Sequence, residues 1–176
     1  SDYRTYQSIT KQRDTDMYAL AFYNLGYSYF KQKDYHEAMN RFRQYVDIEK
    51  NQQAASLADA YNRIGDCQFH NRQFGSAEES YAYAAQLQPS AGDYSMYQKG
   101  FVMGLRKDYK GKINAMDRLI REFPESQYVD DALFEKGRAY VMLENNRSAA
   151  QAFETFVQKF PQSSLTRKAG VQLGLI

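Results

Sequence analysis

The side chains with the most reactive chemistry in this sequence lie close together near its middle. Asp66, Cys67 and His70 fall on one predicted helix, and Cys67 and His70 are three residues apart. A thiol, an imidazole and a carboxylate at this spacing could begin a metal site. Two or three candidate ligands on one helix, with no second cluster elsewhere in the chain, form a weak signal. We therefore expect a buried or inert thiol at Cys67, no metal and no other cofactor.

Signatures of enzymes are missing from the rest of the sequence. It contains neither a Walker-type phosphate loop nor an HExxH motif, and Gly111-Lys112 lacks the rest of a phosphate loop. His36 falls in the first turn of a predicted helix, where a solvated surface role is the expected one. The sequence therefore predicts no catalytic residues and a protein that is not an enzyme.

One turn is rich in positive charge. Arg106, Lys107, Lys110 and Lys112 surround Tyr109 and could touch phosphate or an anionic lipid. We favour a solvated turn between helices, because Asp108 and a net charge of only +2 dilute the patch. The same small charge argues against nucleic acid as the main partner. No apolar run approaches the ~18 residues of a membrane span.

The elements that must position these side chains repeat along the chain. Gly26, Gly65, Gly100, Gly137 and Gly174 are separated by 39, 35, 37 and 37 residues. Sixteen residues after the first four glycines stand Phe42, Tyr81, Met116 and Phe153. Twelve residues after them stand Ala38, Ala77, Lys112 and Ala149. Twenty-four residues after them stand Lys50, Pro89, Pro124 and Pro161. A repeat of this length with fixed small and aromatic positions is typical of a helical solenoid.

Apolar side chains within each repeat follow helical spacing. Phe22, Leu25, Gly26 and Tyr29 recur on one face, which predicts an α-helix. We expect paired helices at 16–32 and 35–49, 54–72 and 74–87, 91–106 and 109–122, and 127–144 and 146–159. Thr15 or Asp16 is expected to cap the first of these, and Asp34 the second. Glycine costs a helix ~1 kcal/mol relative to alanine, so we expect a neighbouring helix to approach closely at each repeated glycine.

These residues resemble the tetratricopeptide repeat, and the resemblance covers essentially the whole chain. Phe123-Pro124-Glu125-Ser126 and Phe160-Pro161-Gln162-Ser163 are similar to turns of the bacterial cell-envelope subtype, found in the Tol–Pal-associated periplasmic protein and in an outer-membrane assembly lipoprotein. Ser126 and Ser163 can cap the helices that follow. Lys112 departs from the small residue of the pattern, and Lys99 and Lys136 depart from the leucine before glycine. We expect these lysines to lie nearer the surface than the family pattern implies.

The resemblance implies an all-α fold, a right-handed α-solenoid of stacked antiparallel helix hairpins. We expect one domain over 1–176, with units near 16–50, 54–89, 91–124 and 127–161. Partial units at 1–12 and 163–176 are expected to belong to a longer repeat protein. The family's peptide-contact positions fall on the first helices, at Tyr23, Tyr27, Phe30, Asn62, Asp66, Phe69, Tyr94, Tyr97, Phe101, Phe134 and Arg138.

Two interpretations of these residues stay open. They could form an aromatic-rich concave groove for a partner segment, or single rings could fill the seam between hairpins. Some family members grip a carboxylate at fixed groove positions, which here hold Tyr23, Tyr27, Arg63, Tyr94 and Gln98, so we do not expect that clamp.

We therefore predict a scaffold that binds a protein or peptide segment, in the periplasm or at the outer membrane of a bacterium; the sequence leaves a cytoplasmic location open. A self-assembling structural spacer is the main alternative, with copies joined through the repeat ends. A glycan-binding module that uses tyrosine platforms is a third.

Overall fold

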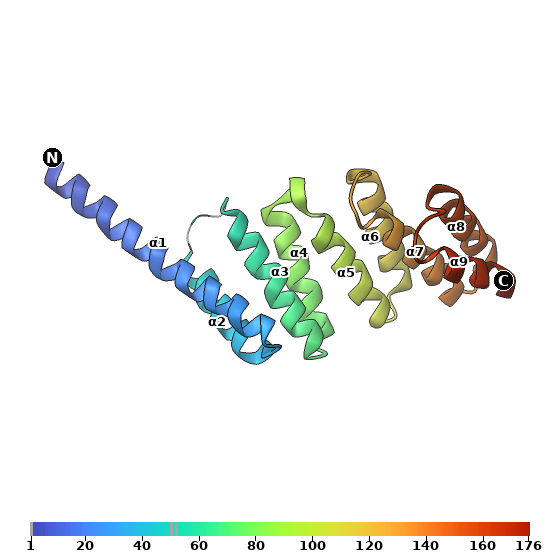
Figure 1. Cartoon of the computed structure of the whole chain (residues 1–176), viewed down its shortest axis with the longest axis horizontal. Coiled ribbons are helices and arrows are strands. Elements are labelled where there is room, and N and C mark those ends of the chain that lie inside the picture. The colour runs from blue at the N-terminus through green and yellow to red at the C-terminus, as the bar shows by residue number, and fades with distance from the viewer. Residues whose placement is uncertain (1, 50, 52) are drawn as a thin grey trace. The chain divides into compact units, whose positions relative to one another are not determined.

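The computed structural model describes residues 2–49, 51 and 53–176, with the side chains of residues 2–10 and 12 excluded. This part of the chain contains nine α-helices, one short 3-10 helix and no strand (Figure 1). None of the helices described is long and apolar enough to cross a membrane. The prediction of an all-α fold is confirmed.

The chain divides into two compact units, Ser1–Pro89 and Ser90–Ile176. The first holds α1 (Asp2–Lys31), α2 (Tyr35–Ile48), α3 (Ala55–His70) and α4 (Phe74–Leu87). A 3-10 turn at Pro89–Ala91 leads into the second unit. That unit holds α5 (Asp93–Leu105), α6 (Tyr109–Glu122), α7 (Val129–Met142), α8 (Asn146–Lys159) and α9 (Thr166–Leu175). One domain over the whole chain stays a prediction.

Consecutive helices of each unit pack against one another as antiparallel pairs (Figure 1). Four of the five repeated glycines lie where the two helices of a pair approach closely. A Cβ atom added at Gly26, Gly65 or Gly137 would lie 2.8, 2.7 or 2.7 Å from a ring carbon of the aromatic residue sixteen positions later. At Gly100 the same atom would lie 2.8 Å from Cε of Met116. The predicted close approach is confirmed at these four glycines and is wrong at Gly174, where nothing lies within 4 Å of an added Cβ.

The side chains that cover the glycines are also the centre of each core. Phe42, Tyr81, Met116 and Phe153 are all at most 1 % exposed. Burying a side chain of this size contributes about 1.5–3 kcal/mol. The small residues expected twelve positions after three of the glycines, Ala38, Ala77 and Ala149, are likewise buried. One spacing thus sets both the helix pairing and the core.

The turns inside the α1–α2, α5–α6 and α7–α8 hairpins share one capped geometry, whereas Gln73 at the start of α4 makes no side-chain cap. Asp34, Asp108 and Asn145 each accept a hydrogen bond through Oδ1 from the backbone N–H three residues later, at 2.9–3.1 Å. The predicted cap at Asp34 is confirmed. The residue before each of these caps has a positive φ, 63° at Lys33, 66° at Lys107 and 56° at Glu144. A left-handed residue followed by a cap reverses the chain within very few residues.

The expected break near residues 12–16 is wrong. Helix α1 runs without interruption from Asp2 to Lys31, so residues 11–16 lie inside it. The Thr15 hydroxyl donates to the carbonyl oxygen of Lys11 at 2.9 Å, one turn earlier, rather than capping a new helix. A threonine hydroxyl can satisfy either arrangement, so its presence does not mark a helix start.

The predicted capping by Ser126 and Ser163 is also corrected, because α7 and α9 begin at Val129 and Thr166. Each serine hydroxyl instead donates to an aspartate 33 residues earlier, Ser126 to Asp93 at 2.6 Å and Ser163 to Asp130 at 3.0 Å. It also accepts from the backbone N–H two residues later. The bond ties the end of a hairpin to the start of its own first helix.

We predict that Gly137→Ala lowers the free energy of unfolding by about 1–3 kcal/mol, because the new methyl group overlaps the buried Phe153 ring. Phe153→Leu in the same chain should recover part of the loss caused by the overlap. Denaturant unfolding followed by circular dichroism measures both effects.

Gly170→Ala is the matched control, because Gly170 lies inside α9 with nothing within 4 Å of an added Cβ. It should raise stability by up to about 1 kcal/mol through helix propensity alone. Equal effects at Gly137 and Gly170 would contradict the close approach.

Candidate functional site

The predicted groove residues of α1 contact the first helix of the next hairpin. The Tyr23 hydroxyl donates to Asp59 Oδ2 at 2.7 Å, and the Tyr27 hydroxyl donates to the same oxygen. The two rings pack edge to face, with centroids 5.1 Å apart. Both side chains are half-buried. They therefore join α1 to α3, and their hydroxyls already have an acceptor within the unit.

This environment raises the pKa of both phenols. Burial is the main cause for Tyr27, and the bond to the Asp59 carboxylate adds to it, which raises the pKa to about 12. Burial and Asp59 move the pKa of Tyr23 well above its usual range. Both tyrosines therefore act as neutral hydrogen-bond donors at physiological pH.

Asp66 was predicted to lie on the groove surface, but it is buried, with only 7 % of the residue exposed. Its Oδ1 accepts a hydrogen bond from Tyr81 at 2.7 Å, and Oδ2 lies 2.6 Å from a guanidinium nitrogen of Arg63. The carboxylate thus links α3 to α4 and is not presented to a ligand. A charge this deeply buried needs such partners.

Cys67, next to Asp66, is fully buried in the core of the first unit. Burial raises the pKa of its thiol to about 12. Among the described residues, no three His, Cys, Asp or Glu side chains are grouped closely enough to hold a metal ion. The arrangement gives Cys67 a packing role.

The remaining predicted groove residues of the first unit also touch neighbours. The Arg63 guanidinium carbon lies 5.8 Å from the centre of the Phe30 ring. The Phe69 ring lies 5.9 Å from that of Phe74, and Asn62 is half-buried. In this unit Phe30 contacts the next hairpin, whereas Phe69 packs within its own hairpin.

The second unit carries a row of four aromatic rings. Tyr97 stacks on Tyr128 with centroids 5.4 Å apart and on Phe101 at 6.3 Å, and Tyr94 meets Tyr128 edge to face at 5.8 Å. All four are half-buried, so part of the row faces outward. Burial, with Asp131 nearby, raises the pKa of Tyr97. Tyr128 was not among the groove residues predicted from the sequence. Its position two residues after the turn serine, Ser126, could have indicated it.

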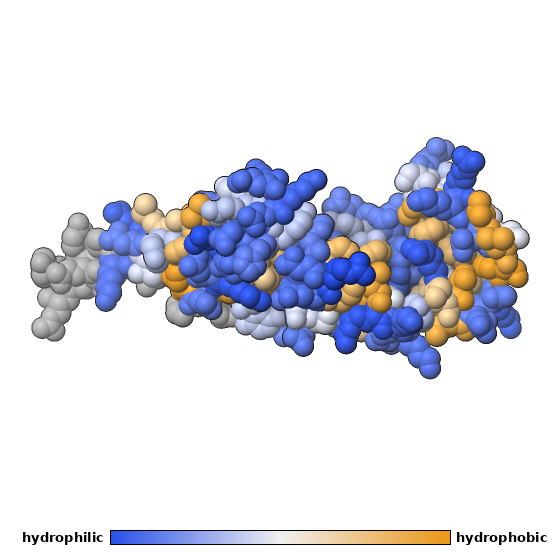
Figure 2. All heavy atoms as spheres, turned by 90° about the horizontal axis from the view of Figure 1, so that it is seen from below, coloured by the Kyte–Doolittle hydropathy of each residue, from blue (hydrophilic) through white to orange (hydrophobic). Residues whose placement is uncertain are grey.

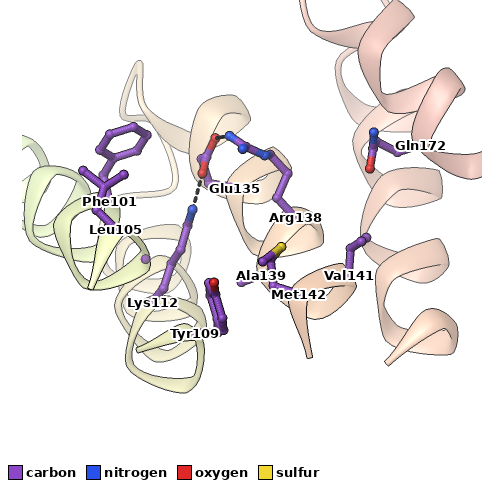
Figure 3. Close-up of a pocket in the computed structure, with 11 residues that line it drawn as sticks. Phe101, Leu105, Tyr109, Lys112, Glu135, Arg138, Ala139, Val141, Met142 and Gln172 are labelled. Atoms are coloured by element: carbon purple, nitrogen blue, oxygen red, sulfur yellow. Dashed lines mark hydrogen bonds and ion pairs between the residues drawn. The ribbon is translucent and has the colours of Figure 1, made fainter. Parts of the chain in front are cut away.

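Phe134 and Arg138, on α7, line pockets of the second unit. Phe134 lines one pocket, and Arg138 lines two. Phe134 is 7 % exposed and packs edge to face on Phe153 and Phe156, so most of its ring belongs to the core. It still lines a pocket of about 520 Å³ together with the exposed Arg138. Arg138 and Phe101 also line a second pocket, of about 370 Å³ (Figure 3). The structure thus brings three predicted groove residues to cavities.

The expectation that Lys112 lies near the surface is wrong. The residue is 7 % exposed, and its ammonium donates to Glu135 Oε2 across the α6–α7 interface. The other Glu135 oxygen accepts from Arg138 at 2.9 Å. The Lys112 ammonium also lies 5.5 Å from the Phe101 ring centre. Lys99 and Lys136 are half-buried, and Lys136 pairs with Asp117.

Comparison with known families finds one match. A model described as the tetratricopeptide repeat matches residues 20–51, 94–126 and 131–163, more than half of the chain. No curated protein matches the sequence. Residues outside the matched ranges include the α3–α4 hairpin, which nevertheless has the same glycine-to-aromatic contact, from Gly65 to Tyr81.

Several solved structures are similar in fold. The MamA protein of Desulfovibrio magneticus RS-1 is 19% identical, with a TM-score of 0.75 over 89% of this chain and 82% of that one. YrrB, described as a tetratricopeptide repeat protein with an unusual peptide-binding site, is 18% identical, with a TM-score of 0.73 over 86% and 74%. A tetratricopeptide repeat protein from Parabacteroides merdae ATCC 43184 is 18% identical, with a TM-score of 0.76 over 88% and 58%. At these identities the likeness shows the fold alone.

We predict that Tyr27 makes the chain sensitive to alkali. Its pKa of about 12 in the folded chain exceeds the value of about 10 expected when unfolded, so its contribution to stability is complete below pH 10 and is lost as pH rises toward 12. The difference in tyrosinate absorbance between wild type and Tyr27→Phe should show the raised pKa. Asp59→Asn should lower that pKa, whereas titration of Tyr27 near pH 10 in the wild type would contradict the assignment.

We predict that Lys112 and Glu135 are strongly coupled. Lys112→Met or Glu135→Met alone should lower the free energy of unfolding by about 3–5 kcal/mol. The loss should be smaller for Lys112→Met, because Arg138 still pairs with Glu135. The double variant should be more stable than the sum of the two losses predicts. Lys136→Met, in a more exposed pair, is the control and should cost about 1 kcal/mol or less. Additive losses in the denaturant-unfolding cycle would contradict the coupling.

Proposed function

This chain belongs to the tetratricopeptide repeat family, and we propose that it is a protein-interaction scaffold that binds a partner segment along the first helices of its hairpins. Repeats of this family generally act as interaction modules. The observation that carries the proposal is the aromatic row Tyr94, Tyr97, Phe101 and Tyr128. Because these rings already stack on one another, a partner that meets them orders few side chains on binding.

The nature of the partner follows from the shape and chemistry of the second unit. Phe101 of the row lines one pocket with Arg138, and Phe134 lines a second pocket with Arg138, which suits a peptide segment with alternating apolar and polar side chains. The related fold of YrrB, described as having a peptide-binding site, supports this proposal. We propose a binding role without catalysis, because Cys67 and Asp66, the residues with the most reactive chemistry, are committed to packing.

We further propose that the protein works in a bacterial cell envelope, at the periplasm or the outer membrane. The support is the resemblance of the two F-P-x-S turns, at 123–126 and 160–163, to repeats of envelope proteins. In the structure, both turns use their serine in the same hydrogen bond to an earlier aspartate.

A structural spacer that joins copies of itself is the second candidate. The observation that favours it is exposed apolar surface on α1, at Met17 and Tyr18, and on α9, at Val171 and Leu175. Figure 2 shows apolar atoms gathered over the C-terminal end of the second unit. Such surface is suited to contact with another chain.

Photo-cross-linking in the source cells tests the scaffold proposal. We predict that benzoylphenylalanine in place of Tyr97 captures a defined protein that the same probe in place of Arg118 does not. Arg118 is exposed on α6 and lies outside the aromatic row. Identical products at both positions would contradict the proposal, and capture of the chain by itself at Tyr97 would favour the spacer. Light scattering over a concentration series then measures self-association directly.

A further inference from the structure

One position of the second unit departs from the repeat in a way that packing alone does not require. Lys112 stands where the other hairpins have the buried alanines Ala38, Ala77 and Ala149. The neighbouring helix makes room for it at Gly104, where an added Cβ would lie 2.7 Å from Lys112 Cδ. A buried ion pair seldom gives more stability than apolar side chains of the same volume. Stability alone therefore does not explain the ion pair of Lys112 and Glu135 at this position.

Lys112 forms the floor of the 370 Å³ pocket, together with Glu135 (Figure 3). An ammonium group has three N–H donors, and the Glu135 carboxylate takes one of them. The rim carries Leu105 and Met142, which occupy equivalent places in successive repeats and are 46% and 58% exposed. A large apolar side chain can thus enter past the rim, with a cation at the floor.

The 520 Å³ pocket adjoins this one, because Arg138 and Gln172 line both. Its other lining residues include Arg167 and Lys168, both exposed on α9. The residues that line the two pockets include four cations, Lys112, Arg138, Arg167 and Lys168, and one carboxylate, Glu135, which pairs with Lys112 and Arg138. The combined surface is therefore strongly positive next to an apolar entrance.

The charge at one repeat position of α9 is opposite to that on two of the four earlier first helices, whereas the other two have the uncharged Leu20 and Tyr94 there. Lys168 lies six residues before Gly174, where the repeats of α3 and α7 place Asp59 and Asp131. Asp59 is satisfied within its own unit by Tyr23 and Tyr27. At α9 the same position offers a cation instead, which leaves the carboxylate to be supplied by a ligand.

We infer that these two pockets form one bipartite site for an internal segment of a partner protein in which an Asp or Glu lies next to a large apolar residue. The apolar side chain occupies the pocket between Leu105 and Met142, and the carboxylate pairs with Arg167 and Lys168 beside Arg138. This inference rests on the proposed scaffold function and adds the chemistry of the partner to it.

Selection from a phage library of random dodecapeptides against the whole chain tests the site. Enriched peptides should combine an acidic residue with a neighbouring Phe, Leu, Ile or Met. Their affinity, measured by fluorescence polarisation with the synthetic peptides, should fall about ten-fold or more in Arg167→Gln/Lys168→Gln and also in Met142→Ser. All three substituted residues are exposed, so the variants should keep the wild-type melting temperature.

Two matched variants control for charge and for apolar surface. Arg118→Gln/Arg121→Gln removes two exposed cations from α6, and Leu143→Ser changes an exposed apolar residue beside Met142 that does not line the pocket. Both should bind the selected peptides as the wild type does. Selected peptides without acidic residues, or equal affinities for all variants, would overturn the site and leave the scaffold function standing. A library that yields no binder would overturn the site, and the cross-linking at Tyr97 would then decide the function independently.

Discussion

The close approach of paired helices at a glycine is the constraint on which the rest of this structure depends. Gly26, Gly65 and Gly137 allow an aromatic ring from the second helix to rest directly on the backbone of the first. The ring is thereby buried, and the hairpin presents a surface of fixed shape against which the next hairpin packs. The side chains that remain outward on the first helices are positioned by this contact together with contacts of their own, such as the stacking of Tyr97 on Tyr128 and the ion pair of Arg138 with Glu135.

The same scaffold serves different purposes in its two units. In the first unit, Asp59 accepts from Tyr23, and Asp66 accepts from Tyr81 and pairs with Arg63. These polar groups therefore hold α1, α3 and α4 together. In the second, Lys112 and Glu135 occupy the interior, and cations gather at cavities. Hairpins of one fold can thus be closed by their own side chains, as in the first unit, or leave cavities lined by cations, as in the second.

The features that sequence spacing predicted are those determined by neighbours within one hairpin. The contact from Gly65 to Tyr81 follows from a fixed interval, and the cap at Asp34 involves only the next three residues. The burial of Lys112 could not be predicted in this way, because its partner Glu135 lies on another helix and no alternative pairing is excluded by sequence. The continuity of α1 was equally inaccessible, since a Thr15 hydroxyl fits a helix start and a helix interior alike.

The serine-to-aspartate bond has a consequence for how such a chain can evolve. Asp93 and Ser126 fall within one stretch of 37 residues, the repeat interval, and Asp130 and Ser163 fall within the next. Duplication or loss of a whole stretch in the gene would carry donor and acceptor together. Copy number in this part of the protein can therefore change by recombination without orphaning either member of the bond.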